Sequence, residues 1–152
     1  MDFAERRRLG YLEALAERGV EPDPALMRSA EMTEVYGHHE TRDMLLLDKP
    51  PTAILAASMI SAIGVRRAIE EAGLVIGKDV SVITHDDDLS YLKNGQDVPI
   101  FTATRSSVRA AGRILAEMLL RRIETPSAEP EHMLLEAELV VGRSTGPAPT
   151  GD

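Results

Sequence analysis

Apolar residues along this chain recur at helical spacing in some stretches and form short continuous runs in others. Spacing of three to four residues is typical of helices that bury one face, whereas short apolar runs between turn signals are typical of buried strands. The pattern predicts helices over residues 3–18, 33–47, 58–72 and 107–123. It predicts strands over residues 26–30, 52–57, 80–84, 100–103 and 133–141. Alternating helices and strands indicate an α/β fold, with a mainly parallel sheet flanked by helices.

Local signals mark the ends of several of these elements. Ser58 stands where its hydroxyl can cap the helix that follows the strand at 52–57, and Gly73 follows the end of that helix. Residues 86–97 are polar and rich in Asp, Asn and Gly, which predicts a surface loop. The last residues, 146–152, are Gly- and Pro-rich, and we expect a disordered tail there.

The composition narrows the possible classes of protein. The chain has 152 residues, 43% of them hydrophobic, which is enough for one packed domain. Its net charge of −8 argues against binding of a nucleic-acid backbone by this chain alone. It has no cysteine, no apolar run long enough to span a membrane, and a charged N-terminus without the apolar core of a signal peptide. These features predict a cytoplasmic protein.

Three acidic residues, 86–88, follow the predicted strand at 80–84 and are the first candidate for chemistry. A carboxylate at the end of a parallel strand can accept hydrogen bonds from ligand hydroxyls, or it can help to hold Mg²⁺. Asp also favours solvated turns, and the pattern alone favours that simpler interpretation. Since no second acidic cluster follows another predicted strand, the sequence offers little for a metal site.

A basic cluster, residues 6–8, opens the first predicted helix and is the second candidate. An arginine there could hold an anionic or hydroxyl-rich ligand through its planar guanidinium group, although spacing alone favours an exposed basic turn. The chain contains none of the common phosphate-binding, zinc-protease or serine-hydrolase motifs, and no serine has an identifiable base. The sequence therefore indicates a protein that is not an enzyme, with no cofactor and no metal.

Four stretches of the chain, in order, resemble the effector-binding core of bacterial transcription regulators of the lactose-repressor (LacI/GalR) family. The first is Arg7-Arg8-Leu9-Gly10-Tyr11, and the second is the Pro-Thr-Ala strand that begins at Pro51 with the Ala-x-Gly helix that contains Gly64. The third runs from Gly73-Leu74 through Asp79-Val80-Ser81-Val82 to Asp86-Asp87. The fourth is Pro99-Ile100-Phe101-Thr102 with the helix at 107–123. Together these stretches cover the chain to about residue 145.

The resemblance implies one lobe of a fold similar to periplasmic binding proteins, in which two α/β lobes hold an effector between them. By the family pattern, residues 1–145 are the C-terminal portion of the effector-binding domain, and helix 107–123 belongs to the other lobe. The family's first lobe and its DNA-binding headpiece have no counterpart in this chain. The resemblance further implies a homodimer that contacts operator DNA only through such a headpiece, with no membrane contact.

The resemblance also assigns roles to individual residues. By position, Arg7 matches the family's ligand-binding arginine, and Asp86 matches the carboxylate that accepts from ligand hydroxyls. Ser58 stands where the family usually has Asn, and Met32 stands where an aromatic residue often packs on the ligand ring. His85 replaces an aromatic residue beside Asp86. An arginine and an aspartate that face one cleft suit a sugar-like effector.

Two other classes of protein remain open from the sequence. One is a fragment of a transporter's solute-binding protein, which shares the fold. The other is a small α/β enzyme that uses Asp86 or Asp87 with Mg²⁺.

Overall fold

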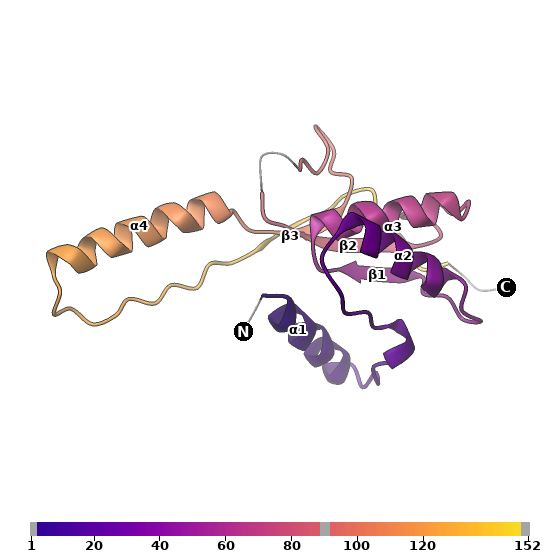
Figure 1. The fold of residues 1–152 in the computed structure, drawn as a ribbon, viewed down its shortest axis with the longest axis horizontal. Helices are drawn as coiled ribbons and strands as arrows, with labels where there is room; N and C mark the ends of the chain where they lie inside the picture. Colours follow the sequence, from indigo (N-terminus) through magenta and orange to yellow (C-terminus); the bar gives the residue numbers. More distant parts are fainter. Residues whose placement is uncertain (1–2, 89–91, 150–152) are drawn as a thin grey trace.

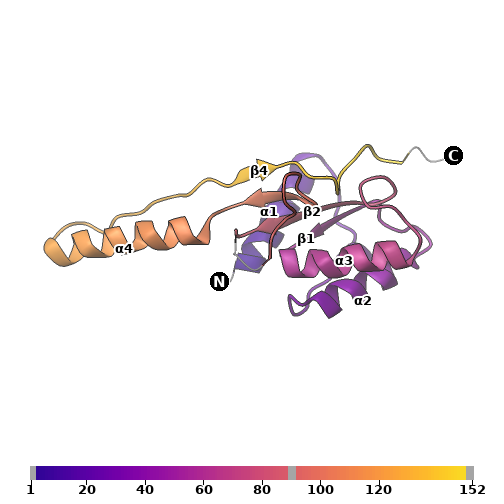
Figure 2. The ribbon, with the colours of Figure 1, turned by 90° about the horizontal axis from the view of Figure 1, so that it is seen from above.

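A computed structural model describes residues 3–88 and 92–149 of the chain. Its core is a four-stranded sheet in the order β1-β2-β3-β4. The strands are β1 (Ala53–Ala56), β2 (Ser81–Asp86), β3 (Thr102–Arg105) and β4 (Glu138–Val140). The first three strands run parallel, and β4 pairs antiparallel with β3 (Figures 1 and 2). The predicted α/β fold with a mainly parallel sheet is therefore confirmed.

Two helices pack together on one side of the sheet. They are α2 (Glu34–Leu45) and α3 (Met59–Glu71), and α3 connects β1 to β2 (Figure 1). Both begin at a capping hydroxyl, because Thr33 accepts from the Tyr36 amide and Ser58 from the Ser61 amide. The core between α3 and the sheet is aliphatic apart from one phenylalanine: Ala56, Met59, Ala62, Val65, Ile69, Val80, Val82 and Phe101.

Two other helices contribute little to this core. Helix α1 (Phe3–Glu17) lies on the other side of β1 from the α2–α3 pair, and α4 (Val108–Glu124) extends away from the sheet (Figure 1). Neither helix has a buried residue. After α4 the chain returns alongside it and enters the sheet as β4 (Figure 2). The molecule is thus a packed lobe with one projecting helical arm.

Several sequence predictions were displaced or wrong. Residues 26–30 do not form a strand; instead a short 3₁₀ turn, η1 (Pro24–Leu26), is capped by the Asp23 carboxylate. Strand β2 continues through Asp86, two residues beyond the prediction, and β3 begins and ends two residues later than predicted. Strand β4 occupies three of the nine residues predicted. Residues 89–91 of the predicted surface loop and 150–152 of the predicted tail lie outside the described residues.

Candidate functional site

The carboxyl ends of the parallel strands form one edge of the sheet, and most of the predicted site residues lie along it. In the register of β1 and β2, Ala56 pairs with Thr84, so the residues that follow, Ala57 and Ser58, lie beside His85 and Asp86. Strand β3 continues this edge, because Asp86 pairs with Arg105. Ligands of open parallel sheets bind at this edge, which makes it the candidate site.

Arg7 reaches this edge from α1. Its Nη1 donates a 2.6 Å hydrogen bond to the carbonyl oxygen of Ala57, and its guanidinium carbon lies 4.7 Å from the centre of the Phe3 ring. Burial lowers the pKa of Arg7, and the nearby carboxylate of Asp87 opposes that shift. Among the described residues Arg7 forms no ion pair.

Ser58 uses its hydroxyl to begin α3. The Oγ accepts from the Ser61 amide at 3.4 Å and lies 3.1 Å from the Ser61 hydroxyl. The predicted cap is therefore confirmed. A hydroxyl oxygen has two lone pairs and one proton, so a ligand contact at Ser58 competes with the Ser61 side chain rather than with the cap.

Asp86 is almost fully buried at the end of β2 and is already paired. Its Oδ2 accepts from the Nε and Nη2 of Arg105, each at 3.3 Å, and its Oδ1 accepts from the Asp88 amide at 3.0 Å. Arg105 was not predicted as a site residue, because the predicted strand at 100–103 ended before it. The signal was present: Arg105 ends a parallel strand beside the one that ends in Asp86.

A polar cavity of about 390 Å³ opens beside this ion pair. Asp86 and Arg105 line it together with residues of the loop that precedes β3, including Lys93, Gln96 and Asp97. Arg7, Ser58 and Met32 are not among the lining residues. The structure therefore divides the site into an Arg7 side, facing α1, and an Asp86 side, facing the loop.

His85 occupies the face of β2 opposite to Asp86, as alternation along a strand requires. Its Nδ1 lies 3.0 Å from Thr104 Oγ1, and its Nε2 lies 3.1 Å from Ser106 Oγ. Burial and, secondarily, the charge of Arg7 lower the pKa of His85, while Asp87 and Asp86 act in the opposite direction. The ring is thus held by two hydroxyls next to the Arg7 side of the site.

Met32 is half-buried one residue before the Thr33 cap of α2. It does not line the cavity beside Asp86, and its assignment as a ligand-packing residue stays a prediction.

Two findings bear on the alternatives raised from the sequence. Within residues 3–88 and 92–149, no group of three or more His, Asp or Glu side chains could hold a metal ion. Asp86 is instead neutralised by Arg105, which gives the Mg²⁺ hypothesis no support. In the same part of the chain, no helix has both the length and the apolar character needed to cross a membrane.

Residues 2–145 match the family model described as "Periplasmic binding protein-like domain". The chain therefore belongs to this family, in the form found in regulators of the lactose-repressor (LacI) family. The HTH-type transcriptional regulator AglR of Rhizobium meliloti (strain 1021) is 46% identical over 150 residues, which are 98% of this chain and 42% of AglR. The HTH-type transcriptional regulator CelR of Thermobifida fusca is 31% identical over 89% of this chain and 39% of CelR. The chain thus spans less than half the length of these relatives.

Solved structures show the same relationship. The dimeric Lac repressor with an 11-residue C-terminal deletion superposes with a TM-score of 0.80 at 29% identity, over 97% of this chain and 52% of that one. A complex of the transcriptional regulator CelR with cellobiose gives a TM-score of 0.77 at 30% identity, over 91% of this chain and 41% of that one. The resemblance found in the sequence is confirmed, and the structure corresponds to one lobe of the effector-binding core.

Proposed function

We propose that this chain is the effector-sensing part of a LacI-type transcriptional regulator and that a sugar-like molecule binds at the carboxyl ends of β1 and β2. The observation that carries the proposal is the placement of Arg7, Ser58 and Asp86 along one edge of a parallel sheet, with Arg7 on its α1 side and Asp86 on its loop side. The CelR–cellobiose complex supports a sugar as the ligand class. In this proposal Arg7 and Ser58 contact ligand hydroxyls directly, and Met32 packs near the ligand ring.

Asp86 requires a more specific role, because its carboxylate already accepts from Arg105 and the Asp88 amide. A carboxylate has about four lone-pair sites, so Asp86 can accept a ligand hydroxyl in addition to these donors. Arg105 holds the carboxylate in one orientation and keeps a buried charge compensated. We infer that Arg105 positions Asp86 for the ligand.

The remaining features of the proposal concern the whole regulator. The protein is not an enzyme, works in the cytoplasm, and acts on operator DNA only through a headpiece outside this chain.

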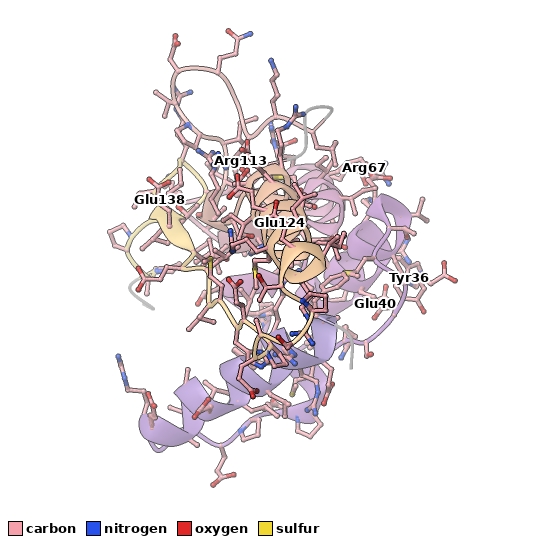
Figure 3. The ribbon with its side chains drawn as sticks, turned by 90° about the vertical axis from the view of Figure 1, so that its left-hand side faces the viewer. Tyr36, Glu40, Arg67, Arg113, Glu124 and Glu138 are labelled. Atoms are coloured by element: carbon pink, nitrogen blue, oxygen red, sulfur yellow. The ribbon has the colours of Figure 1, made fainter. Side chains whose placement is uncertain are left out.

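A homodimer is proposed through the outer face of α2 and α3. Four exposed apolar residues on these helices support it: Val35, Tyr36, Ile60 and Ile63. Figure 3 shows Tyr36 and Arg67 at the outer surface of the α2–α3 pair, away from α4.

A chimera of AglR tests this function. The stretch of AglR that matches this chain is replaced by residues 1–152, and a reporter gene under AglR control is measured with a panel of sugars that includes cellobiose and ribose. Native AglR is the positive control, and light scattering on the purified chimera measures its oligomeric state, expected to be a dimer.

We expect at least one sugar to change reporter expression, and Arg7→Ala to remove that response while repression persists. Arg6→Ala is the matched control, because Arg6 is the exposed neighbour of Arg7 on α1. A chimera in which Arg7→Ala responds like the parent would contradict the proposed site.

A further inference from the structure

The carboxyl end of β3 brings a further hydroxyl to the sheet edge. Ser106 directly follows β3 and is half-buried. Its amide donates to the Asp86 carbonyl at 3.1 Å, and the Val108 amide donates to the Asp87 carbonyl at 3.3 Å, so the residues after β3 are tied to the end of β2. Ser106 is therefore fixed at the edge where open parallel sheets bind their ligands.

The side chain of Ser106 is held by His85. The Nε2 atom of the ring lies 3.1 Å from Ser106 Oγ, and the Nδ1 atom lies 3.0 Å from Thr104 Oγ1. Because both nitrogens of one planar ring are engaged, rotation of the ring would break one contact or the other. The Ser106 hydroxyl thus has a defined position next to Nε2.

This pair lies on the same side of the sheet as Arg7. Asp86 belongs to the buried face of β2, which packs against α3, and alternation puts His85 on the opposite face. Helix α1 lies on that opposite side (Figure 1). Arg7 reaches from α1 to the carbonyl of Ala57, which lies beside His85 in the strand register. The His85-bound hydroxyl of Ser106 therefore belongs to the Arg7 side of the site.

Arg7 and Ser106 offer complementary hydrogen bonds to a sugar. A guanidinium group only donates, so it binds ligand oxygens as acceptors. A sugar hydroxyl also carries a proton that needs an acceptor. The Ser106 hydroxyl has one proton and two lone pairs, and it keeps at least one lone pair whether it donates to His85 Nε2 or accepts from it. Ser106 can thus accept from a ligand hydroxyl with either tautomer of His85.

We propose that Ser106 accepts a hydrogen bond from an effector hydroxyl on the Arg7 side of the site, and that His85 is the positioning residue that holds Ser106 Oγ for this contact. The inference rests on the proposed function, because it concerns the same effector. It gives the Arg7 side an uncharged acceptor of its own, whereas the Asp86 carboxylate faces the loop side.

A comparison of sugars with their deoxy analogues tests this contact in the AglR chimera. The reporter is titrated with cellobiose, ribose and glucose and with the monodeoxy analogues of each, and the half-maximal concentrations are compared. One analogue should lack the hydroxyl that Ser106 binds, and it should need about two- to tenfold more than its parent sugar, as expected for one uncharged hydrogen bond. In Ser106→Ala this ratio should fall to about one, while the ratios of the other analogues persist.

Two variants separate positioning from contact. His85→Phe keeps a planar ring without its nitrogens and should reduce the same ratio. The double variant Ser106→Ala with His85→Phe should lose no more than Ser106→Ala alone, because His85 acts through Ser106. Ser127→Ala, in the exposed loop after α4, is the control and should keep every ratio. Repression without sugar reports separately on folding; should Ser106→Ala fail to repress, the ratio in His85→Phe decides.

The inference is overturned if Ser106→Ala, or His85→Phe in its place, keeps every sugar-to-analogue ratio. Independent, additive losses in the double variant also contradict it, because His85 would then not act through Ser106. If Arg7→Ala removes the sugar response but every ratio survives in Ser106→Ala, the effector site stands and this contact alone is wrong. If no sugar acts, or if Arg7→Ala responds like the parent, the proposed site fails and the contact fails with it.

Discussion

Ser144 shows how much of this fold depends on one buried hydroxyl. The residue lies in the segment after β4 and is completely buried. Its Oγ accepts from the Thr102 amide at 2.8 Å and donates to the Val82 carbonyl, and its own carbonyl accepts from the Val82 amide at 2.7 Å. It thereby links β2 and β3 near their amino ends, where their direct pairing begins at Ile83 and Thr102.

Replacement of this hydroxyl should destabilise the lobe. In Ser144→Ala the Thr102 amide and one lone pair of the Val82 carbonyl lose their partner in a buried place, which costs about 1–3 kcal/mol. Urea unfolding followed by circular dichroism measures the change. Ser127→Ala, in the exposed loop after α4, is the control and should stay near the wild type. Equal stability of the two variants would show that the Ser144 hydroxyl is not needed for the fold.

For single residues, sequence reasoning predicted some positions along the sheet edge and missed others. The ends of the predicted strands placed Ser58 and Asp86 at this edge, and the family resemblance added Arg7; their contact with a ligand stays a prediction. Arg105 was missed because its role depends on register, which brings together two residues 19 positions apart. No local pattern predicts such a pair until the lengths of both strands are known.

Among the elements, the α2–α3 pair has the closest backbone contact. A Cβ atom at Gly64 would collide with the carbonyl oxygen of Glu34, and one at Gly37 would collide with the carbonyl oxygen of Ser61. The two helices therefore need glycine at both crossing points. At the edges of the contact, Arg67 forms an ion pair with Glu34, and His38 Nε2 lies 2.7 Å from a carboxylate oxygen of Glu71. One side chain of each pair is exposed, so these contacts add orientation more than stability.

Alanine at Gly64 should separate these helices. The added methyl group meets backbone that cannot move aside without displacing α2, and overpacking of this kind costs about 1–3 kcal/mol. Gly112→Ala is the matched control, because a Cβ there meets no atom within 4 Å and alanine favours the helix α4. Thermal unfolding compares the two variants. A melting temperature of Gly64→Ala equal to or above that of Gly112→Ala would contradict the close-packed interface.

The sequence predicted those helices and strands that a capping residue or an apolar run marks locally. The capped helices α2 and α3 and the strand β1 were predicted within a few residues, since caps and apolar runs are local. The false strand at 26–30 follows Pro24, which favours the 3₁₀ turn that the Asp23 carboxylate caps. The last two residues of β2 were missed because His85 and Asp86 are polar, and they become strand through pairing with β3.

In the molecule as a whole, the projecting helix α4 exposes large apolar residues that no other part of the lobe covers. Four large apolar residues of α4 are at least 60% exposed: Leu115, Leu119, Leu120 and Ile123. Figure 3, which views the molecule along the arm, shows Arg113 and Glu124 on α4 in front of the sheet. An apolar stripe of this size marks a surface that packs against protein. The family pattern supports the other lobe as its partner, and we propose that packing here.

The lobe itself could be predicted from periodicity, whereas its correspondence to one lobe of a two-lobed fold could be predicted only from the resemblance. The hydrophobic pattern of residues 107–123 indicates a helix with one apolar face, but it contains no information on what covers that face. The lengths of the relatives confirm that this chain corresponds to less than half of such regulators. The division of the site into an Arg7 side and an Asp86 side also required coordinates, because α1 approaches the sheet from far away in the sequence.

Chemical-shift mapping determines whether the effector binds where β1 and β2 end. A ¹⁵N-labelled sample of the 152-residue chain is titrated with the sugar to which the AglR chimera responds, and backbone amide shifts are followed. The account predicts that the largest shifts cluster at Ala57, Ser58, His85, Asp86 and Asp87, and that Arg7→Ala abolishes them. Shifts confined to the outer face of α2 and α3, or to α4, would contradict it.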